Sequence, residues 1–314
     1  MKILLTGSSG YLGQHFLHAL IRATNDDDEI FATFGSNGAA LEGIGILESY
    51  RYSLKIDKLD LRDKDCIRDY FEANGSFDIC FHLAAMASPK LCESNPEKTK
   101  QTNIPRHLFN KLKGTPIIAL STDQVYCGAK APYSENSEPG PVNVYAQSKL
   151  EMEQLLIGDK ERLKPAVCLR SSIILGPLAP YGQAHSTFLH FCQSRDKKET
   201  TFFTDEIRSV ISVKDVVAVL LHFYSCVKSA KEFKSTVFNM GGPSPVSRMD
   251  MAVAVAKGCG FSYDVFIAAE KAKRERGVDE VLSPLDISMN SAKLENFVEQ
   301  KFRGLDAIVK DSFA

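Results

Sequence analysis

Several features are missing from this sequence, and each absence excludes a class of protein. The 314 residues contain no apolar run near the ~20 that a membrane-spanning helix needs. The N-terminus lacks the basic, apolar and small-residue regions of a secretory signal. Basic and acidic residues nearly balance, at 38 and 39, so no strong field attracts nucleic acid or an anionic membrane. We therefore expect no nucleic-acid partner and no membrane partner.

The cysteines are not arranged as in a zinc protein or a disulfide scaffold. Eight of them are spread along the chain, and no two form a C-x-x-C motif. This pattern predicts reduced thiols, no metal site and a cytoplasmic location. With 44% hydrophobic and 25% charged residues, the composition is that of an ordinary globular protein.

Short apolar segments alternate with helical patterns over the first half of the chain. Strands are expected at 2–6, 29–34, 54–61, 78–83, 116–120 and 166–170. The intervening helices include one over 96–112 and one over 143–156. Strands that alternate with helices form a parallel sheet with ligands at the carboxyl ends of the strands. The sequence thus predicts an α/β fold with a Rossmann-type, doubly wound parallel sheet.

The alternation breaks after Gly176-Pro177. We expect residues 1–176 to form a domain that binds NAD or NADP. Residues 177–211 and 241–314 are expected to form a smaller, mixed C-terminal lobe for the substrate. Between these parts, a helix and a strand within 212–240 are expected to return to the main sheet.

A glycine-rich turn follows the first expected strand. Gly7, Gly10 and Gly13 have the spacing G-x-x-G-x-x-G. Glycine there permits a tight turn, a close approach of backbone to pyrophosphate, and close packing of helix on strand. The N-terminus of the next helix offers free N–H groups and a partial positive charge to the phosphates. The turn therefore predicts dinucleotide binding.

The end of the second strand bears on which dinucleotide is bound. An acidic residue there usually holds the adenosine ribose, but this strand ends in TFGSN at 33–37. Without a carboxylate, a 2′-phosphate meets no repulsion and could accept hydrogen bonds from Ser36 and Asn37. We expect NADP, with NAD as the alternative. Asp60 and Leu61 are placed to meet the adenine, unless Asp60 only caps the next helix.

A Y-x-x-x-K motif lies on the helix expected over 143–156. Tyr145 and Lys149 are four residues apart and share one helix face. A nearby ammonium favours the phenolate, so the phenol becomes a better acid at neutral pH. Thr122 follows the fifth expected strand, where it could hold a substrate oxygen while Tyr145 gives or takes its proton.

Four segments together resemble the extended short-chain dehydrogenase/reductase family. They are TGSSGYLG at 6–13, HLAA at 82–85, STDQVYCG at 121–128 and PYSENSEPGPVNVYAQSKLEME at 132–153. The most similar subgroup is that of dTDP-4-dehydrorhamnose reductase, which includes the regulatory beta subunit of methionine adenosyltransferase. The resemblance extends over nearly the whole chain.

The resemblance implies roles for individual residues. The implied catalytic group is Thr122, Tyr145 and Lys149. The implied cofactor-binding residues, beside Ser36 and Asn37, are Gly7, Gly10, Tyr11, Leu12, Gly13, Asp60, Leu61, Ala84, Ala85, Met86, Asn103, Tyr145 and Lys149. The expected substrate contacts are Thr122, Asp123 and Arg208. Arg208 could pair with a substrate pyrophosphate as a planar fork or form a structural ion pair.

The implied activity is NADP(H)-dependent reduction of a carbonyl, foremost in a nucleotide-linked 4-keto-6-deoxysugar, with the proton from Tyr145. Related dehydratases have a glutamate base where this chain has Gln124, so dehydration is not expected. Ser283-Pro284 replaces an Arg-Pro of the rhamnose reductases, so the sugar stays open. Two alternatives remain: a sugar-nucleotide epimerase, and an NADP-binding regulatory subunit that would partner the methionine adenosyltransferase catalytic subunit.

Overall fold

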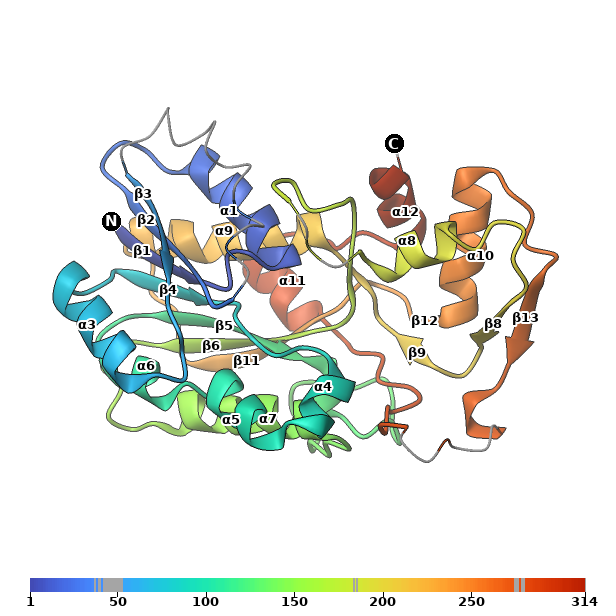
Figure 1. Ribbon diagram of the computed structural model, residues 1–314, viewed down its shortest axis with the longest axis horizontal. Coiled ribbons are helices and arrows are strands. Elements are labelled where there is room, and N and C mark those ends of the chain that lie inside the picture. The colour runs from blue at the N-terminus through green and yellow to red at the C-terminus, as the bar shows by residue number, and fades with distance from the viewer. Residues whose placement is uncertain are drawn as a thin grey trace.

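The structure is a computed structural model that describes residues 1–36, 38, 41, 53–182, 184, 186–273, 277 and 280–313. A twisted parallel sheet with helices on both faces forms the larger part, and a smaller lobe lies beside it (Figure 1). None of the described helices has the length and apolar character needed to cross a membrane.

Seven parallel strands make up the central sheet. They are β1 (Lys2–Thr6), β2 (Glu29–Phe34), β3 (Leu54–Lys58), β4 (Ile79–His82), β5 (Ile117–Thr122), β6 (Ala166–Ser171) and β11 (Thr236–Met240). Their spatial order is β11-β6-β5-β4-β1-β2-β3. The chain winds outward in both directions from β1, which pairs with β2 on one side and β4 on the other. This topology confirms the predicted fold class and opens a ligand crevice at the carboxyl ends of these strands.

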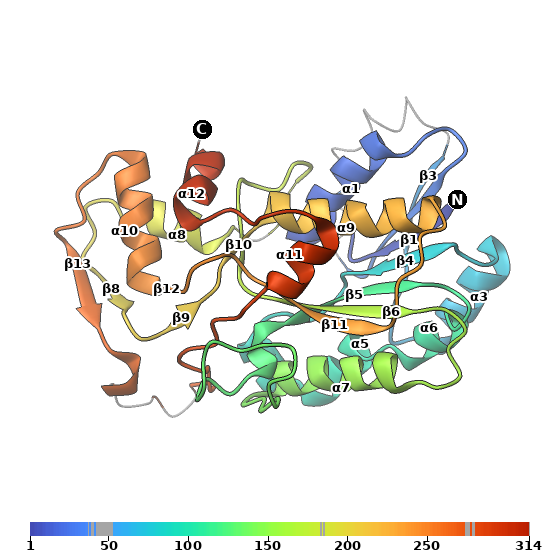
Figure 2. The same cartoon turned by 180° about the vertical axis from the view of Figure 1, so that it is seen from behind.

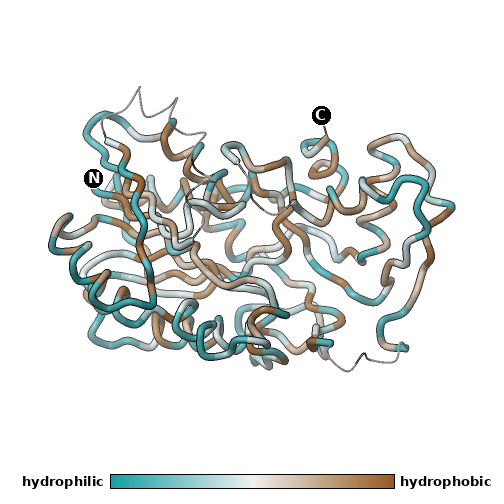
Figure 3. The backbone as a smooth tube through the Cα atoms, in the orientation of Figure 1, coloured by the Kyte–Doolittle hydropathy of each residue, from teal (hydrophilic) through white to brown (hydrophobic). Residues whose placement is uncertain are grey.

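Two hydrophobic cores lie on the two faces of the sheet. One face packs against α1 (Tyr11–Ala23), α9 (Val213–Lys228) and α11 (Ala292–Val298). The other packs against α3 (Lys64–Asn74), α6 (Arg106–Lys111) and α7 (Val144–Gly158). Figures 1 and 2 show the two helical layers, and Figure 3 shows the apolar segments between them. Because both faces are covered, the inner strands are largely apolar, whereas the edge strand β3 reads LKIDK and is only partly buried.

Two helical segments differ from the prediction. The helix expected over 96–112 is split into α5 (Pro96–Asn103) and α6. Pro105 separates them because proline has no N–H to donate and disfavours a helical conformation in the residue before it. A short helix that was not predicted, α4 (Pro89–Ser94), begins where the Ser88 hydroxyl accepts a hydrogen bond from the N–H of Leu91.

The smaller lobe has a hydrophobic core of its own. Its elements are α8 (Phe188–Gln193), β8 (Thr200–Phe203), α10 (Arg248–Cys259), β13 (Phe266–Ala269) and α12 (Leu305–Phe313). Short strand pairs join β7 (Ile174–Leu175) to β10 (Ile211–Ser212), and β9 (Ile207–Arg208) to β12 (Val246–Ser247). The 3₁₀ helices are η2 (Asp123–Val125) and η3 (Lys271–Lys273). Arg208 of this lobe lies near Asp123, which directly follows β5 at the carboxyl edge of the large sheet.

Candidate active site

A cavity of about 550 Å³ opens at the carboxyl ends of β1, β2, β3 and β4. Eight of the predicted cofactor-binding residues line it: Gly7, Gly10, Ser36, Asp60, Leu61, Ala84, Ala85 and Met86. Asn37 lies outside the described residues. The structure thus brings together segments 6–10, 33–36, 58–62 and 83–86, as a dinucleotide site at this edge requires.

The glycines of the turn leave room that any side chain would fill. Gly7 has a φ of 77°, and a Cβ there would come within 2.6 Å of the backbone nitrogen of Ala84. A Cβ on Gly13 would overlap the carbonyl oxygen of Gly7. Gly10 immediately precedes α1, so the free N–H groups of the helix begin at the cavity wall. This backbone cradle fits a dinucleotide pyrophosphate.

Tyr11 and Leu12 are oriented differently from what their predicted role suggests. Both side chains are buried in the hydrophobic core, and the Tyr11 hydroxyl donates to the carbonyl of Pro177 at 2.9 Å. Neither residue lines the cavity. Any contact of these two residues with a pyrophosphate would therefore be made through backbone N–H groups.

The adenine end of the cavity carries two cations that the sequence analysis did not single out. Lys58 and Arg62 line the wall beside Asp60. Arg62 donates to the two carboxylate oxygens of Asp60 at 2.9 and 2.6 Å, and this hydrogen bonding is the main reason that the Asp60 pKa falls to about 2. Asp63, not Asp60, caps α3. The proximity of Arg62 to Asp60 in sequence was the signal that could have revealed this pair.

The catalytic group predicted from the sequence gathers where β5 ends and α7 begins. Asn143 caps α7 by accepting from the N–H of Ala146 at 2.9 Å, which starts the helix directly before Tyr145. Burial and the charge of Asp123 raise the pKa of Tyr145 to about 12, and the Thr122 hydroxyl opposes this rise. The expectation that the Lys149 ammonium makes Tyr145 a better acid is therefore wrong for this structure, because the effect of burial is larger. Lys149 is 2% exposed, and burial lowers its pKa to about 8.

Asn103 does not line the cavity but connects its wall to the catalytic helix. Its side-chain oxygen accepts from the N–H of Met86 at 2.7 Å. Its amide donates to the carbonyl of Met86 at 3.1 Å and to the hydroxyl of Ser148 at 2.9 Å. Because Ser148 lies between Tyr145 and Lys149 in sequence, Asn103 holds the catalytic helix at a fixed place relative to the cofactor cradle.

The two other expected substrate contacts, Asp123 and Arg208, are buried near each other. Burial raises the pKa of Asp123, and the positive charge of Arg208 opposes that shift. The Arg208 guanidinium donates to the carbonyls of Ile207 and Leu285 at 2.7 Å and of Pro284 at 2.9 Å. These contacts favour the structural alternative for Arg208, in which it holds segment 283–285 against the site.

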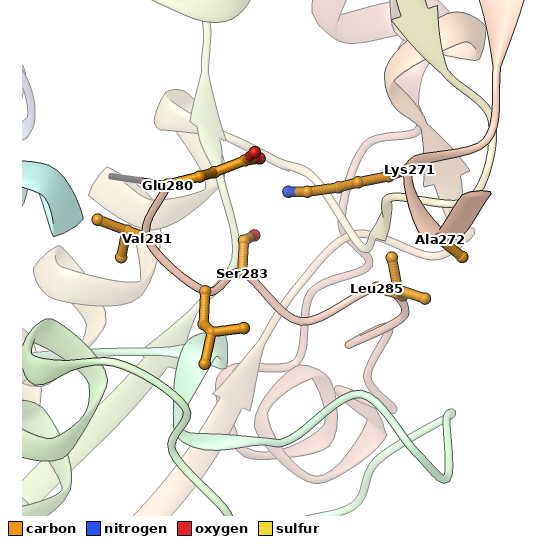
Figure 4. Close-up of a pocket in the computed structure, with 7 residues that line it drawn as sticks. Lys271, Ala272, Glu280, Val281, Ser283 and Leu285 are labelled. Carbon is orange, nitrogen blue, oxygen red and sulfur yellow. The ribbon is translucent and has the colours of Figure 1, made fainter. Parts of the chain in front are cut away.

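A charged cluster lies beside Arg208 and was not anticipated. Glu206 lies 2.7 Å from Arg248 and 2.8 Å from Lys271. Burial alone would raise the pKa of Glu206, but Arg248, Arg208 and Lys271 lower it to about 2. A cavity of about 160 Å³ is lined by Lys271, Ala272 and residues 280–283 and 285. Figure 4 shows Lys271 and Glu280 extending toward each other across it. No local sequence motif could have joined these distant positions.

With this geometry established, comparison with known families decides the identification. The family model described as the RmlD substrate binding domain matches residues 1–311. The chain belongs to this family. The resemblance to extended short-chain dehydrogenases/reductases of the RmlD-like group is thereby confirmed. Membership in this family supports an NAD(P)-dependent enzyme of the reductase type.

Individual relatives of this RmlD-family chain are distant in sequence. The methionine adenosyltransferase 2 subunit beta of Danio rerio is 24% identical over 259 residues, which cover 81% of this chain and 73% of the relative. The ADP-L-glycero-D-manno-heptose-6-epimerase of Pseudomonas aeruginosa is 25% identical over 272 residues, 81% of this chain and 77% of the relative.

Solved structures share the fold over almost the full length. A hypothetical dTDP-4-dehydrorhamnose reductase from Sulfolobus tokodaii has a TM-score of 0.76 at 23% identity, covering 98% of both chains. The UDP-glucose 4-epimerase of Thermotoga maritima, solved with UDP-glucose, has a TM-score of 0.77 at 20% identity, covering 99% of this chain and 97% of that one. Reductases and epimerases are thus equally good structural matches.

Proposed function

We propose that this RmlD-family protein is an NADP(H)-dependent reductase of a carbonyl group in a nucleotide-linked sugar, with 4-keto-6-deoxysugars as the first substrate class. The observation that carries the proposal is the group formed by the buried Thr122 and Lys149 and the half-buried Tyr145, near the dinucleotide cradle. Ketone reduction needs a hydride donor, a proton donor and an oriented carbonyl oxygen, and this site supplies the last two. A cytoplasmic location and the division at residue 176 stay parts of this proposal, except that α11, from the lobe expected over 241–314, packs against the large sheet.

The proposed chemistry assigns one task to each side chain. When bound, the nicotinamide supplies the hydride to the substrate carbon. The Thr122 hydroxyl orients the carbonyl oxygen by a hydrogen bond, and the Tyr145 phenol donates its proton to that oxygen. With a pKa near 12, Tyr145 holds this proton at neutral pH. The charge of Lys149 stabilises the phenolate left behind, and its ammonium would also bind the nicotinamide ribose.

The cradle residues would hold the cofactor in this proposal. Backbone groups at Gly7 and Gly10 would bind the pyrophosphate, Asp60 and Leu61 the adenosine, and residues 84–86 the inner side of the dinucleotide. NADP is proposed over NAD because Ser36, Lys58 and Arg62 line the adenosine end of the cavity. Ser36 and Asn37 would donate to the 2′-phosphate.

On the substrate side, Asp123 and Arg208 are proposed as contacts of different kinds. Asp123 would accept from a sugar hydroxyl beside the reacting carbonyl. Arg208 would face the pyrophosphate of the nucleotide only where that anion displaces one of its backbone partners in segment 283–285.

The proposal is tested with purified protein, NADPH or NADH, and a set of dTDP-4-keto-6-deoxysugars. Oxidation of the nicotinamide, followed by absorbance, is the expected result. A separate fluorescence titration reports whether each cofactor binds. If the cofactor binds and no sugar of the set is reduced, this substrate class is excluded.

A second candidate function is that of a regulatory subunit. Its support is the likeness to methionine adenosyltransferase 2 subunit beta over 81% of this chain. The proposed partner would be a methionine adenosyltransferase catalytic subunit. Because Ile308 and Val309 of α12 belong to the core of the smaller lobe, deleting the C-terminus would damage that lobe. Reversing the charges of the exposed Asp306 and Lys310 is the better test of a contact there. A stoichiometric complex, weakened by these reversals, would favour the subunit.

The epimerase alternative rests on the same tyrosine and lysine, and on neighbours such as the Thermotoga maritima enzyme. An epimerase would interconvert nucleotide sugars with only catalytic amounts of NAD and no net oxidation of NADPH. Product analysis of UDP- and ADP-linked sugars incubated with NAD separates this activity from reduction.

A further inference from the structure

A buried ion pair lies directly behind the catalytic residues and has no part in the chemistry described above. Glu153 on α7 and Arg170 on β6 are 3% and 4% exposed and lie 2.7 Å apart. The Ser121 hydroxyl donates to Glu153 at 2.5 Å. Since Ser121 precedes Thr122 on β5, the Glu153 carboxylate joins the strand end that carries Thr122 to the helix that carries Tyr145 and Lys149.

The pair is itself held from further across the sheet. Arg170 donates to the Tyr126 hydroxyl at 2.9 Å, and Tyr126 donates to the side-chain oxygen of Asn239 on β11 at 2.7 Å. Tyr126 and Asn239 are fully buried. The carboxylate therefore has a fixed position, with bonded partners on β5 and β6.

Glu153 is also the anion that acts on Lys149. It lies one helical turn beyond Lys149, on the same face of α7. The other titratable groups facing Lys149 are neutral near pH 7. Burial lowers the pKa of His82 to about 3, raises that of Tyr145 to about 12 and raises that of Cys168 far above its usual range. Burial of Lys149 favours its neutral amine, and Cys168 and Glu153 oppose this effect. Because the Cys168 thiol is neutral near pH 7, the opposing negative charge is that of Glu153, which is ion-paired with Arg170.

We propose that Glu153 is a positioning residue whose carboxylate keeps Lys149 charged and fixes the catalytic helix against the strand end that carries Thr122. This inference deepens the proposed function and rests on it, because the charge on Lys149 matters for the use of Tyr145 as an acid and for binding the nicotinamide ribose.

The decisive measurement is the titration of Lys149 in the protein without cofactor. Lysines are labelled with ¹³C at Cε, and the Lys149 signal is assigned by its loss in Lys149→Met. We expect a midpoint near pH 8 in the wild type. In Glu153→Gln the midpoint should fall by about one pH unit or more, because the neighbouring anion is gone while burial remains.

Cofactor binding provides the functional readout. The wild type should lose affinity for NADPH as pH rises through the Lys149 midpoint, because the ammonium becomes neutral. In Glu153→Gln this loss should occur at a correspondingly lower pH. If the wild type binds neither NADPH nor NADH, the proposed function fails, whereas the lysine titration still decides the role of Glu153.

Matched variants separate charge from packing. Glu151→Gln on the same helix breaks an exposed pair with Arg106 and should leave the Lys149 midpoint unchanged. Glu153→Asp retains the charge and should keep the midpoint closer to wild type than Glu153→Gln does. If Glu153→Gln does not fold, the double variant Glu153→Gln/Arg170→Met leaves no unpaired buried ion, and a smaller fall of the midpoint in the same direction is expected, because the neighbouring cation is removed with the anion. An unchanged midpoint in either folded variant would overturn the proposal and leave Glu153 a purely structural residue.

Discussion

The proposed cofactor side and the proposed substrate side of the site are built in different ways. The cradle is formed mainly by four loops that each directly follow a strand of the sheet, and its wall includes the small residues Gly7, Gly10, Gly35, Ala84 and Ala85. The substrate side is formed around Asp123, Glu206 and Arg208, which are buried charged side chains. Their partners, such as Arg248 and segment 283–285, are far away in sequence.

This difference has an energetic consequence. A change in the cradle alters the space and the N–H groups offered to a ligand, so it should act mainly on cofactor affinity. A change on the substrate side leaves a buried charge without its partner, which destabilises a protein strongly. Changes in the cradle should therefore lower cofactor affinity more than stability. Changes on the substrate side should lower stability more than cofactor affinity.

The largest expected effect lies where the two sides meet. Tyr145→Phe removes the proton donor and little binding surface, so the rate of reduction should fall about 10²–10⁴-fold with almost unchanged NADPH affinity. Steady-state kinetics and fluorescence titration measure the two quantities. Tyr263→Phe, at a tyrosine 39% exposed in the smaller lobe, is the control. Retention of more than about a tenth of the rate would show that Tyr145 is not the acid.

The glycine turn tests the limit of this division, because Gly13 packs against the turn itself and does not line the cavity. Gly13→Ala places a Cβ on the carbonyl of Gly7, so it should cost about 1–3 kcal/mol of stability and abolish dinucleotide binding. At Gly10 the nearest atom to a new Cβ is 3.4 Å away, so Gly10→Ala should fold with nearly wild-type stability. Thermal melts and NADPH titrations of both variants check this. Equal melting temperatures would contradict the close packing of Gly13 on the turn.

What could be predicted from the sequence follows the same division. The G-x-x-G-x-x-G turn, residues 84–86 and the Y-x-x-x-K motif are local patterns, so their places in the fold could be expected from spacing alone. The doubly wound sheet followed from the alternation of apolar strands and helices. The site roles of these residues stay predictions until the variants are measured.

The parts that could not be predicted depend on long-range contacts. Nothing near Glu206 in sequence indicates that Arg248 and Lys271 surround it. Two of the carbonyls that accept from Arg208 belong to Pro284 and Leu285, which lie 76 and 77 residues further along the chain. Pro105 could have indicated the break between α5 and α6 from the sequence alone. The helical pattern continues on both sides of it, so one continuous helix was expected.

On the substrate side, Arg208→Lys tests whether a change there lowers stability more than it lowers ligand affinity. A lysine cannot donate to several carbonyls in one plane, so backbone groups of Ile207, Pro284 and Leu285 would lose partners. We expect a loss of about 1–3 kcal/mol in the free energy of unfolding, and intact NADPH affinity. Arg195→Lys is a control in the same lobe, because among the described residues the Arg195 side chain bonds the neighbouring Ser194 hydroxyl and lies over the Phe191 ring, without holding a distant segment. A raised KM for the sugar with an unchanged melting temperature would instead identify Arg208 as a pyrophosphate ligand.

The smallest expected effect concerns the choice between NADPH and NADH. Ser36 offers a neutral donor at the cavity wall, and Arg62 is already engaged by Asp60. Neutral hydrogen bonds contribute roughly 0.5–1.5 kcal/mol each, so the preference for NADPH should be modest, about ten- to a hundredfold. Ser36→Asp places a carboxylate where the 2′-phosphate would lie, and it should invert this preference by repelling the phosphate and accepting from the ribose hydroxyls.

Arg62→Gln tests the same preference between NADPH and NADH at a second residue that lines the cavity. It removes a cation while retaining a hydrogen-bond donor, so NADPH affinity should fall by about tenfold or less while NADH affinity stays nearly constant. The effect should shrink at high salt, because Arg62 is 39% exposed and its charge is screened by ions. Fluorescence titrations of both reduced cofactors at low and high salt measure this directly. Tighter binding of NADH than NADPH by the wild type would show that the adenosine end of the cradle selects the ribose hydroxyls rather than a phosphate.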